Sequence, residues 1–273
     1  MIELPESHTL KSQLHRTVTG KIINKVTANH SPHKFAWFHG DPGEYHPLLS
    51  GKKITGAASY GGLIEVQAEN TCMVFGDGTN LRYFPAGEKL PDKHQLLIEF
   101  EDQTALVCSV QMYGALWAME GDCTEGYYLS SKSKTAPLSE QFDETYFLAL
   151  LQSCKQNLSA KAFLATEQRI PGLGNGVLQD ILFHAKLHPK RKLMSLSENE
   201  ILNMYRSVKH TLSEMTEQGG RDTEKDLFGH PGGYRTRLSA KTKDNPCPVC
   251  GDSIIREAYL GGNVYYCPTC QRI

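Results

Sequence analysis

The chain has 273 residues, which is enough for two modest domains with a hydrophobic core each. Hydrophobic residues make up 40% and charged residues 22%, as in ordinary globular proteins, and no apolar run approaches the roughly 18 residues of a membrane span. The net charge of −1 gives no sign of a nucleic-acid partner, and the first ten residues lack the pattern of a signal peptide.

The charge is unevenly divided along the chain. Residues 151–273 hold 17 basic and 12 acidic residues, whereas residues 1–150 hold 12 basic and 18 acidic ones. A basic half beside an acidic half is compatible with nucleic-acid binding through the basic half, although solvated surface charge explains the same count. Four of the eight cysteines are scattered and four lie in the last 27 residues, a usage that suits a reducing cytoplasm with one metal site.

Residues 1–130 are predicted to be mainly β-structure. One helix is expected near the start, at about residues 5–18. Residues 96–100 and 105–110 have the length and apolar content of strands, and glycine- and proline-rich turns separate such runs. The spacing predicts an N-terminal β-sandwich. Residues 131–139 are polar with one proline and are the expected linker.

Residues 140–243 are predicted to form a helical domain. Apolar residues at helical spacing run from Phe147 to Leu158 and again from Ile201 to Leu212, with another helix around residues 181–183. Ser197 and Glu200 have the spacing of a capping box before the last of these helices. Residues 219–245 are rich in glycine and polar residues and are expected to form a loop that becomes ordered on binding. We therefore expect an α+β chain of several domains.

The last segment, residues 244–273, is predicted to be a zinc finger. Cys247, Cys250, Cys267 and Cys270 form two CxxC pairs separated by 16 residues. Two such pairs present four thiolates tetrahedrally from a β-hairpin, and the sequence between them alternates as strand, glycine turn and strand. Two unrelated or redox-active cysteine pairs are the disfavoured alternative. Four thiolates leave no open position, so the predicted Zn²⁺ is structural.

A second motif lies in residues 161–175. A helix leads to a Pro-Gly-x-Gly turn, and another helix begins at or near Asn175. Exposed backbone N–H groups at that start, together with the Asn175 amide and Lys161, would bind a phosphate group. A helical corner with Asn175 as a simple N-cap explains the same residues equally well.

Several further short segments match the same known family as this order of features. They are Glu3–Glu6, Pro85–Glu88, Pro137-Leu138 with Phe142, His188-Pro189, and the Cys-Gln-Arg that ends the finger. Together they resemble the formamidopyrimidine-DNA glycosylase / endonuclease VIII family over essentially the whole chain. The resemblance implies a β-sandwich, a helix–two-turn–helix domain and a Cys₄ finger. It also implies base-excision repair, in which a damaged base is flipped out of duplex DNA.

The resemblance assigns the catalytic end of the chain to Ile2, Glu3 and Glu6. An N-terminal amine attacks C1′ of the sugar, displaces the base and forms a Schiff base that leads to strand cleavage. An α-amine has an ordinary pKa of about 7.7–8.0, so part of it is neutral near pH 7. Glu3 matches the acid that protonates the sugar oxygen. The amine is that of Ile2 or of Met1, and retention of Met1 is expected because Ile2 is large.

The sequence departs from the family at several positions. Ile2 replaces the usual proline, and no lysine stands near Gly61 or arginine near Gly262, where the family pattern has them. Gln111 stands at an arginine position in the segment that fills the gap left by the flipped base, where Tyr113 is expected to take over. Lys161 and Asn175 are expected to contact phosphates beside the target nucleotide.

Three functions remain open at this point. The first is a DNA glycosylase with AP-lyase activity on oxidised bases or abasic sites, and the second is a damaged-DNA-binding protein of the same fold with weak or no catalysis. The third, a zinc-ribbon protein of transcription or assembly, leaves the N-terminal and Gly-x-Gly-Asn motifs unexplained. We expect double-stranded DNA as the partner, no membrane, a monomer, and a place in the bacterial cytoplasm at the nucleoid.

Overall fold

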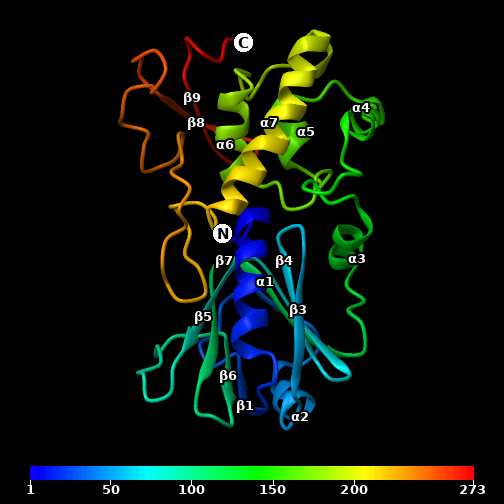
Figure 1. The fold of residues 1–273 in the computed structure, drawn as a ribbon, viewed down its shortest axis with the longest axis vertical. Coiled ribbons are helices and arrows are strands. Elements are labelled where there is room, and N and C mark those ends of the chain that lie inside the picture. The colour runs from blue at the N-terminus through cyan, green and yellow to red at the C-terminus, as the bar shows by residue number, and fades with distance from the viewer. The chain divides into compact units, whose positions relative to one another are not determined.

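The computed structural model describes residues 1–273, except for the side chain of residue 77. It divides into two units (Figure 1). The first unit comprises Met1–Ser133 and Glu224–Gly232, and the second comprises Lys134–Thr223 and Gly233–Ile273. Among the described helices, none combines the length and apolar character needed to cross a bilayer.

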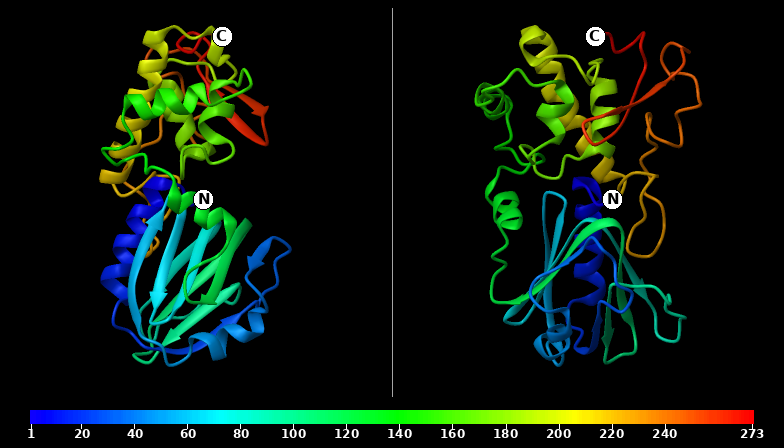
Figure 2. Two further views of the ribbon diagram at one scale, coloured as in Figure 1. Left: turned by 90° about the vertical axis from the view of Figure 1, so that its right-hand side faces the viewer. Right: turned by 180° about the vertical axis from the view of Figure 1, so that it is seen from behind.

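The first unit opens with helix α1 (Leu4–Val18), which confirms the expected helix. Glu3 and Glu6 form a capping box at its start, and Pro5 occupies the first turn, where its missing N–H costs nothing. One face of α1, including Leu10 and Leu14, is buried in the main core of this unit. Figure 2 shows α1 along one side of the sheet, where it packs against β3 and β4.

Seven strands of the first unit hydrogen-bond in the order β1-β6-β7-β5-β4-β3, with β2 parallel to β7. Their bounds are β1 (Ile23–Ala28), β2 (Ala36–Phe38), β3 (Ile54–Tyr60), β4 (Leu63–Ala68), β5 (Thr71–Phe84), β6 (Leu96–Phe100) and β7 (Ala105–Glu120). The start of β5 pairs with the end of β7 next to β4, while the end of β5 pairs with the start of β7 next to β6. The two long strands thus pass through both layers, and the predicted sandwich is confirmed.

The pairing of β5 with β7 is interrupted where the strands pass between the layers. Gly76 pairs with Ala115 and Thr79 with Val110, so β7 spends two more residues than β5 between these points. A Cβ added to Gly78 would lie 2.3 Å from the carbonyl oxygen of Tyr113. Only glycine lets the bulged segment of β7 approach β5 this closely.

Short helices complete the first unit. They are the 3₁₀ turn η1 (Pro42–Glu44), α2 (Tyr45–Leu49) and α3 (Gly126–Ser133). The expected linker of residues 131–139 therefore begins inside α3, which the Ser131 hydroxyl ties to the sheet by donating to the Tyr60 carbonyl at 2.9 Å.

The second unit is helical, as predicted. Its helices are α4 (Glu144–Gln152), α5 (Ala160–Ala165), α6 (Asn175–His184), the 3₁₀ turn η2 (Leu193–Ser195) and α7 (Glu198–Glu217). The capping box of Ser197 and Glu200 is confirmed at the start of α7. The prediction that one helix runs to Leu158 was wrong, because α4 ends at Gln152. Leu158 instead accepts a backbone hydrogen bond from Leu193, and Ser159 caps the next helix.

The chain ends in a two-stranded hairpin, β8 (Ile255–Tyr259) and β9 (Gly262–Tyr266), between the two cysteine pairs. The predicted strand, glycine turn and strand are confirmed. Leu260 and Gly261 both have positive φ in the turn, which Gly261 adopts without strain. As expected, residues 219–245 hold no helix or strand in the described structure, only isolated bridges.

Candidate active site and nucleic-acid interface

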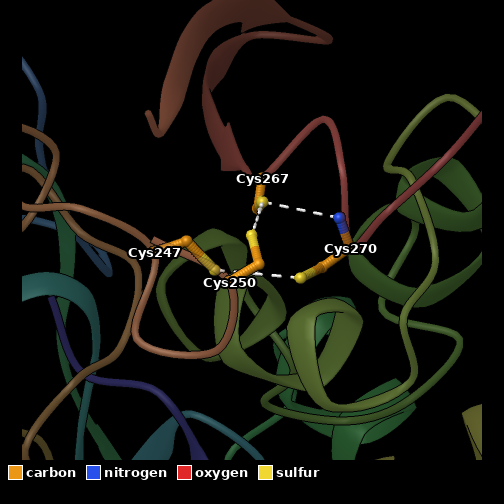
Figure 3. Close-up of side chains that lie close together, drawn as sticks. All are labelled: Cys247, Cys250, Cys267 and Cys270. Carbon is orange, nitrogen blue, oxygen red and sulfur yellow. Dashed lines mark hydrogen bonds between the residues drawn. The ribbon is translucent and has the colours of Figure 1, made fainter. Parts of the chain in front are cut away.

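The four cysteines of the finger form one metal-binding cluster (Figure 3). Their sulfur atoms all lie within 4.8 Å of one another, with Cys250 3.4 Å from Cys267 and Cys247 3.9 Å from Cys270. The Cys270 N–H also points at the Cys267 sulfur, at 3.4 Å. Four thiolates from two tight turns provide a closed set of soft ligands around one metal position.

Gln271 joins this cluster to the helical part of the second unit. Its side-chain oxygen accepts from the Cys267 N–H at 3.0 Å, and its amide donates to the Leu187 carbonyl at 3.0 Å. The residue is fully buried, so both bonds are shielded from water. Gln271 thereby links the cysteine cluster to the turn that follows α6.

Asn175 connects α6 directly to the finger hairpin. Its side-chain amide donates to the backbone carbonyl of Asn263 at 2.9 Å. The side-chain amide of Gln179 donates to the backbone carbonyls of both Asn175 and Asn263. Gly174, not Asn175, is the N-cap of α6. The alternative interpretation of Asn175 as a simple cap is therefore wrong, and its side chain lies at the hairpin turn.

Lys161 reaches the same hairpin from α5. Its ammonium donates to the Tyr259 carbonyl at 2.6 Å, and the Tyr259 hydroxyl donates to Ser159 at 3.0 Å. Lys161 is buried, and that burial lowers the pKa of its amine. Arg256, which is exposed on β8, donates to the Asn263 side chain at 3.2 Å. The hairpin turn thus gathers an amide and two cations, of which sequence reasoning missed Arg256.

The N-terminal amine lies at the head of α1 in the first unit. The Met1 ammonium forms an ion pair with the Glu224 carboxylate, and the side chains of both residues are partly exposed. Ile2, Glu3 and Glu6 behind it are buried, and the Glu3 N–H donates to the Glu6 carboxylate at 3.1 Å. Met1 is therefore the exposed first residue of an otherwise buried segment.

Glu224 is brought to the amine by the segment Glu224–Gly232, seen beside the N-terminus in Figure 1. Gln13 of α1 donates to the Asp226 carboxylate at 2.8 Å and accepts from the Leu227 N–H at 2.9 Å. The Tyr83 N–H donates to the Leu227 carbonyl, also at 2.9 Å, and Leu227 is fully buried in the main core. These bonds fix the segment to α1 and β5.

The bulge of β7 places Gln111 and Met112 on the surface of the first unit. Tyr113 stacks on Trp37 of β2, with ring centroids 5.4 Å apart and planes 28° apart. Tyr113 follows these two residues on the bulge and is half-buried, and its expected role in the gap left by a flipped base stays a prediction. Trp37 was not singled out from the sequence.

Comparison with known proteins decides the family. A 30% identical relative, the formamidopyrimidine-DNA glycosylase of Pasteurella multocida, matches over 281 residues that cover the whole of both chains. The chain belongs to the formamidopyrimidine-DNA glycosylase family. The sequence model of the formamidopyrimidine-DNA glycosylase H2TH domain matches residues 134–226. The formamidopyrimidine-DNA glycosylase of Thermus thermophilus is 29% identical over 99% of this chain and 98% of its own.

Solved structures of formamidopyrimidine-DNA glycosylases share the fold. The MutM (Fpg) protein of Thermus thermophilus superposes with a TM-score of 0.80 at 25% identity, and 98% of each chain is covered. The Lactococcus lactis Fpg, solved in complex with DNA containing an abasic site, gives a TM-score of 0.85 at 22% identity, over 99% of this chain and 100% of that one.

The family pattern places a lysine at the turn between β3 and β4. In this chain the turn carries Gly61 and Gly62 instead. The Ser7 hydroxyl of α1 donates to the Gly61 carbonyl at 2.5 Å, so the turn lies against the head of α1. Another element, α3, places an exposed lysine next to this turn. The Lys132 ammonium of α3 lies 5.0 Å from the centre of the Tyr60 ring, next to the turn. No sequence motif marked this lysine, because the contact joins residues far apart in the chain.

Proposed function

We propose that the chain is a DNA glycosylase with AP-lyase activity, which acts on damaged or abasic duplex DNA through the α-amine of Met1. The observation that carries this proposal is the terminal amine of the exposed Met1, which is ion-paired with Glu224 and lies close in sequence to the buried Glu3. The names of the relatives and the abasic DNA bound by the Lactococcus lactis protein support the substrate class.

The reaction begins with transfer of one ammonium proton from Met1 to the Glu224 carboxylate, because a protonated amine has no lone pair. The freed lone pair forms a bond to C1′ of the sugar. The C1′–N bond to the damaged base breaks, and the base leaves with that electron pair and takes a proton from water. Two groups on the first unit thus supply the nucleophile and its base.

Glu3 acts on the sugar ring in the next step. The new C1′–N bond leaves the Met1 nitrogen as a secondary ammonium, which first loses a second proton to water. The Glu3 carboxyl group then protonates O4′ as the C1′–O4′ bond opens, and the regained nitrogen lone pair completes a C1′=N iminium ion. Loss of a C2′ proton then expels the 3′-phosphate and cuts the strand. Glu6 holds the Glu3 backbone through the capping box, and the buried Ile2 side chain anchors the first residues.

The second unit supplies the phosphate contacts. Asn175 and Lys161, both fixed to the finger hairpin, bind phosphates beside the target nucleotide, and Arg256 supplies a cation where Gly262 has none. On the first unit, Gln111 and Tyr113 project from the bulge into the space left by the flipped base. Zn²⁺ is the metal that suits four thiolates, and it would hold the hairpin without touching substrate.

We place the protein in the bacterial cytoplasm, as a monomer acting on the nucleoid. The cysteine usage and the bacterial relatives support this assignment, since none of the eight cysteines forms a disulfide in the described structure.

Borohydride trapping tests the proposal. The reagent reduces the iminium ion to a permanent amine, so incubation with an abasic duplex and borohydride should link the protein to DNA one to one. Digestion and mass spectrometry should place the link on the Met1 nitrogen. Chain acetylated at its N-terminus is the matched control and should give no link. Tight binding of the abasic duplex with no link and no base release would instead select the lesion-binding alternative.

A further inference from the structure

Three aromatic rings gather on the surface of the first unit where β2 meets the bulge of β7. We call Phe35, Trp37 and Tyr113 the aromatic platform. Phe35 is 47% exposed and Trp37 is 45% exposed. The other tryptophan, Trp117, is 8% exposed and packs in a core cluster. Trp37 is therefore not needed to fill the core, and its exposure costs hydrophobic free energy unless something covers it.

The backbone holds the platform rigidly. Trp37 pairs with Ala115 in the parallel β2–β7 ladder, and the Gly114 N–H donates to the Phe35 carbonyl at 3.0 Å. The Trp37 and Tyr113 rings stack at 5.4 Å and 28°, which leaves Trp37 half open to solvent. A preformed, half-open stack can accept another flat ring without loss of backbone entropy.

One lysine that forms no ion pair with the described residues lies at the platform. Residues 21–40 contain three lysines and no acidic residue, but Lys21 and Lys25 are ion-paired with Asp102 and Glu99, which leaves Lys34. The Lys34 ammonium lies 5.2 Å from the centre of the Phe35 ring. Residues 104–119, which carry the bulge, have no charged side chain. Aromatic rings interleaved with cations are the arrangement that binds single-stranded nucleic acid.

We propose that the aromatic platform binds unpaired nucleobases of locally melted DNA, with Trp37 stacking on a base next to the gap occupied by Tyr113. This inference rests on the proposed function for its DNA partner, and it adds a preference for DNA with more than one unpaired base. Phosphates of the same strand lie along the Lys34 side. Each base stacked on an aromatic side chain strengthens binding by roughly 5- to 150-fold.

The two tryptophans make a direct test possible. A Trp117→Phe variant retains Trp37 as its single indole, so its fluorescence reports on the platform alone. We expect quenching when this variant binds an oligonucleotide duplex with a bubble of about three unpaired thymines. A fully paired duplex of the same length should quench much less.

A second variant measures the contribution to binding. We expect Trp37→Leu to raise the ratio of the bubble Kd to the paired-duplex Kd about tenfold, and Trp37→Phe to restore part of it. Met194→Ala, at an exposed apolar residue of η2, is the control and should leave the ratio unchanged. Circular dichroism of each variant establishes that it is folded.

An unchanged ratio in folded Trp37→Leu, or no quenching by the bubble, would overturn the inference. If the platform binds another protein rather than bases, the Kd ratio should likewise stay unchanged and the bubble should not quench Trp37. The bubble experiments test the platform separately from the proposed function, because borohydride trapping detects only the reaction of the terminal amine. Trapping could fail while the bubble still quenches Trp37, or succeed while it does not.

Discussion

The amine of Met1 and the carboxylate of Glu224 meet in one compact unit although 223 residues separate them in the chain. The segment that carries Glu224 is held by Gln13 and by the buried Leu227, so the acid is presented to the amine by the fold. In the proposed reaction, Glu224 is the acceptor for the proton that the Met1 amine must lose before it can act as a nucleophile.

Glu224→Gln should slow the formation of the borohydride-trapped link by about a hundredfold at pH 7, since general base catalysis typically contributes roughly 10²–10⁴-fold. Single-turnover trapping at pH 7 measures the rate of link formation. Glu88→Gln, at an exposed glutamate, is the control. A variant that traps as fast as the parent at pH 7 would contradict the role of Glu224.

Removal of the metal should weaken duplex binding at least tenfold. Without the metal the cysteine turns lose their common ligand, and the hairpin that contacts Asn175 and Lys161 loses its support. Elemental analysis should find one zinc per chain, and chelation followed by fluorescence anisotropy gives the affinity. Recovery on adding Zn²⁺ is the control. Full affinity in a metal-free, Cys250→Ala chain would argue against the finger as a DNA-binding element.

The dependence of affinity on salt separates the roles of two residues. Lys161→Met should weaken binding and lower the slope of log K against log salt by about 0.9, the value for one lost phosphate contact. Asn175→Ala should weaken binding with little change in slope, because the amide is neutral. If Lys161→Met loses affinity with its slope unaltered, the lysine serves only to hold the Tyr259 carbonyl.

Asp180 should make stability depend on pH. Its carboxylate accepts from the Arg237 and Leu238 N–H groups at 2.8 Å, yet burial raises its pKa to about 6 from 3.8. A raised folded-state pKa gives stability that is complete below about pH 3.8 and lost as pH rises through about 6, roughly 3 kcal/mol in all. Relative to Asp180→Asn, the parent should therefore become less stable as the pH rises from about 4 to about 6 in urea unfolding. Parallel curves for the two proteins would refute this.

Gly78→Ala should lower the free energy of unfolding by roughly 1–3 kcal/mol, the usual cost of overpacking. The new Cβ would lie 2.3 Å from the Tyr113 carbonyl, and a backbone atom in a strand cannot swing aside. Thermal unfolding measures the loss. Gly126→Ala is the matched control, since nothing lies within 4 Å of its added Cβ. Equal melting temperatures for the two variants would show that the bulge tolerates the methyl group.

Much of the fold could be read from the sequence because local patterns determine it. The cysteine spacing predicted the hairpin and the metal cluster, and the capping pair Ser197 and Glu200 marked the start of α7. Helical periodicity misled at Leu158, where the apolar spacing continued although α4 ends at Gln152 and Leu158 bonds instead to Leu193. Periodicity records which side chains are buried and carries no information on where the backbone turns.

The parts of the site that escaped prediction depend on contacts between distant segments. Glu224 looked like one acid among several in a polar loop, and Lys132 like a charge at the edge of a linker. Trp37 lies in a three-residue strand whose parallel partner is far along the chain. The contacts of these three residues can be identified only in the folded structure, where the sheet and the segment Glu224–Gly232 bring distant parts of the chain together.

The segment Glu224–Gly232 has a practical consequence for dissecting the molecule. The polypeptide passes from one compact unit to the other at residues 133–134, 223–224 and 232–233, so a single cut cannot separate them cleanly. A fragment ending at Ser133 would lack Leu227 and leave an apolar hole beside α1 and β5. Truncated fragments would consequently be poor surrogates for the intact polypeptide, and point substitutions are the appropriate instrument.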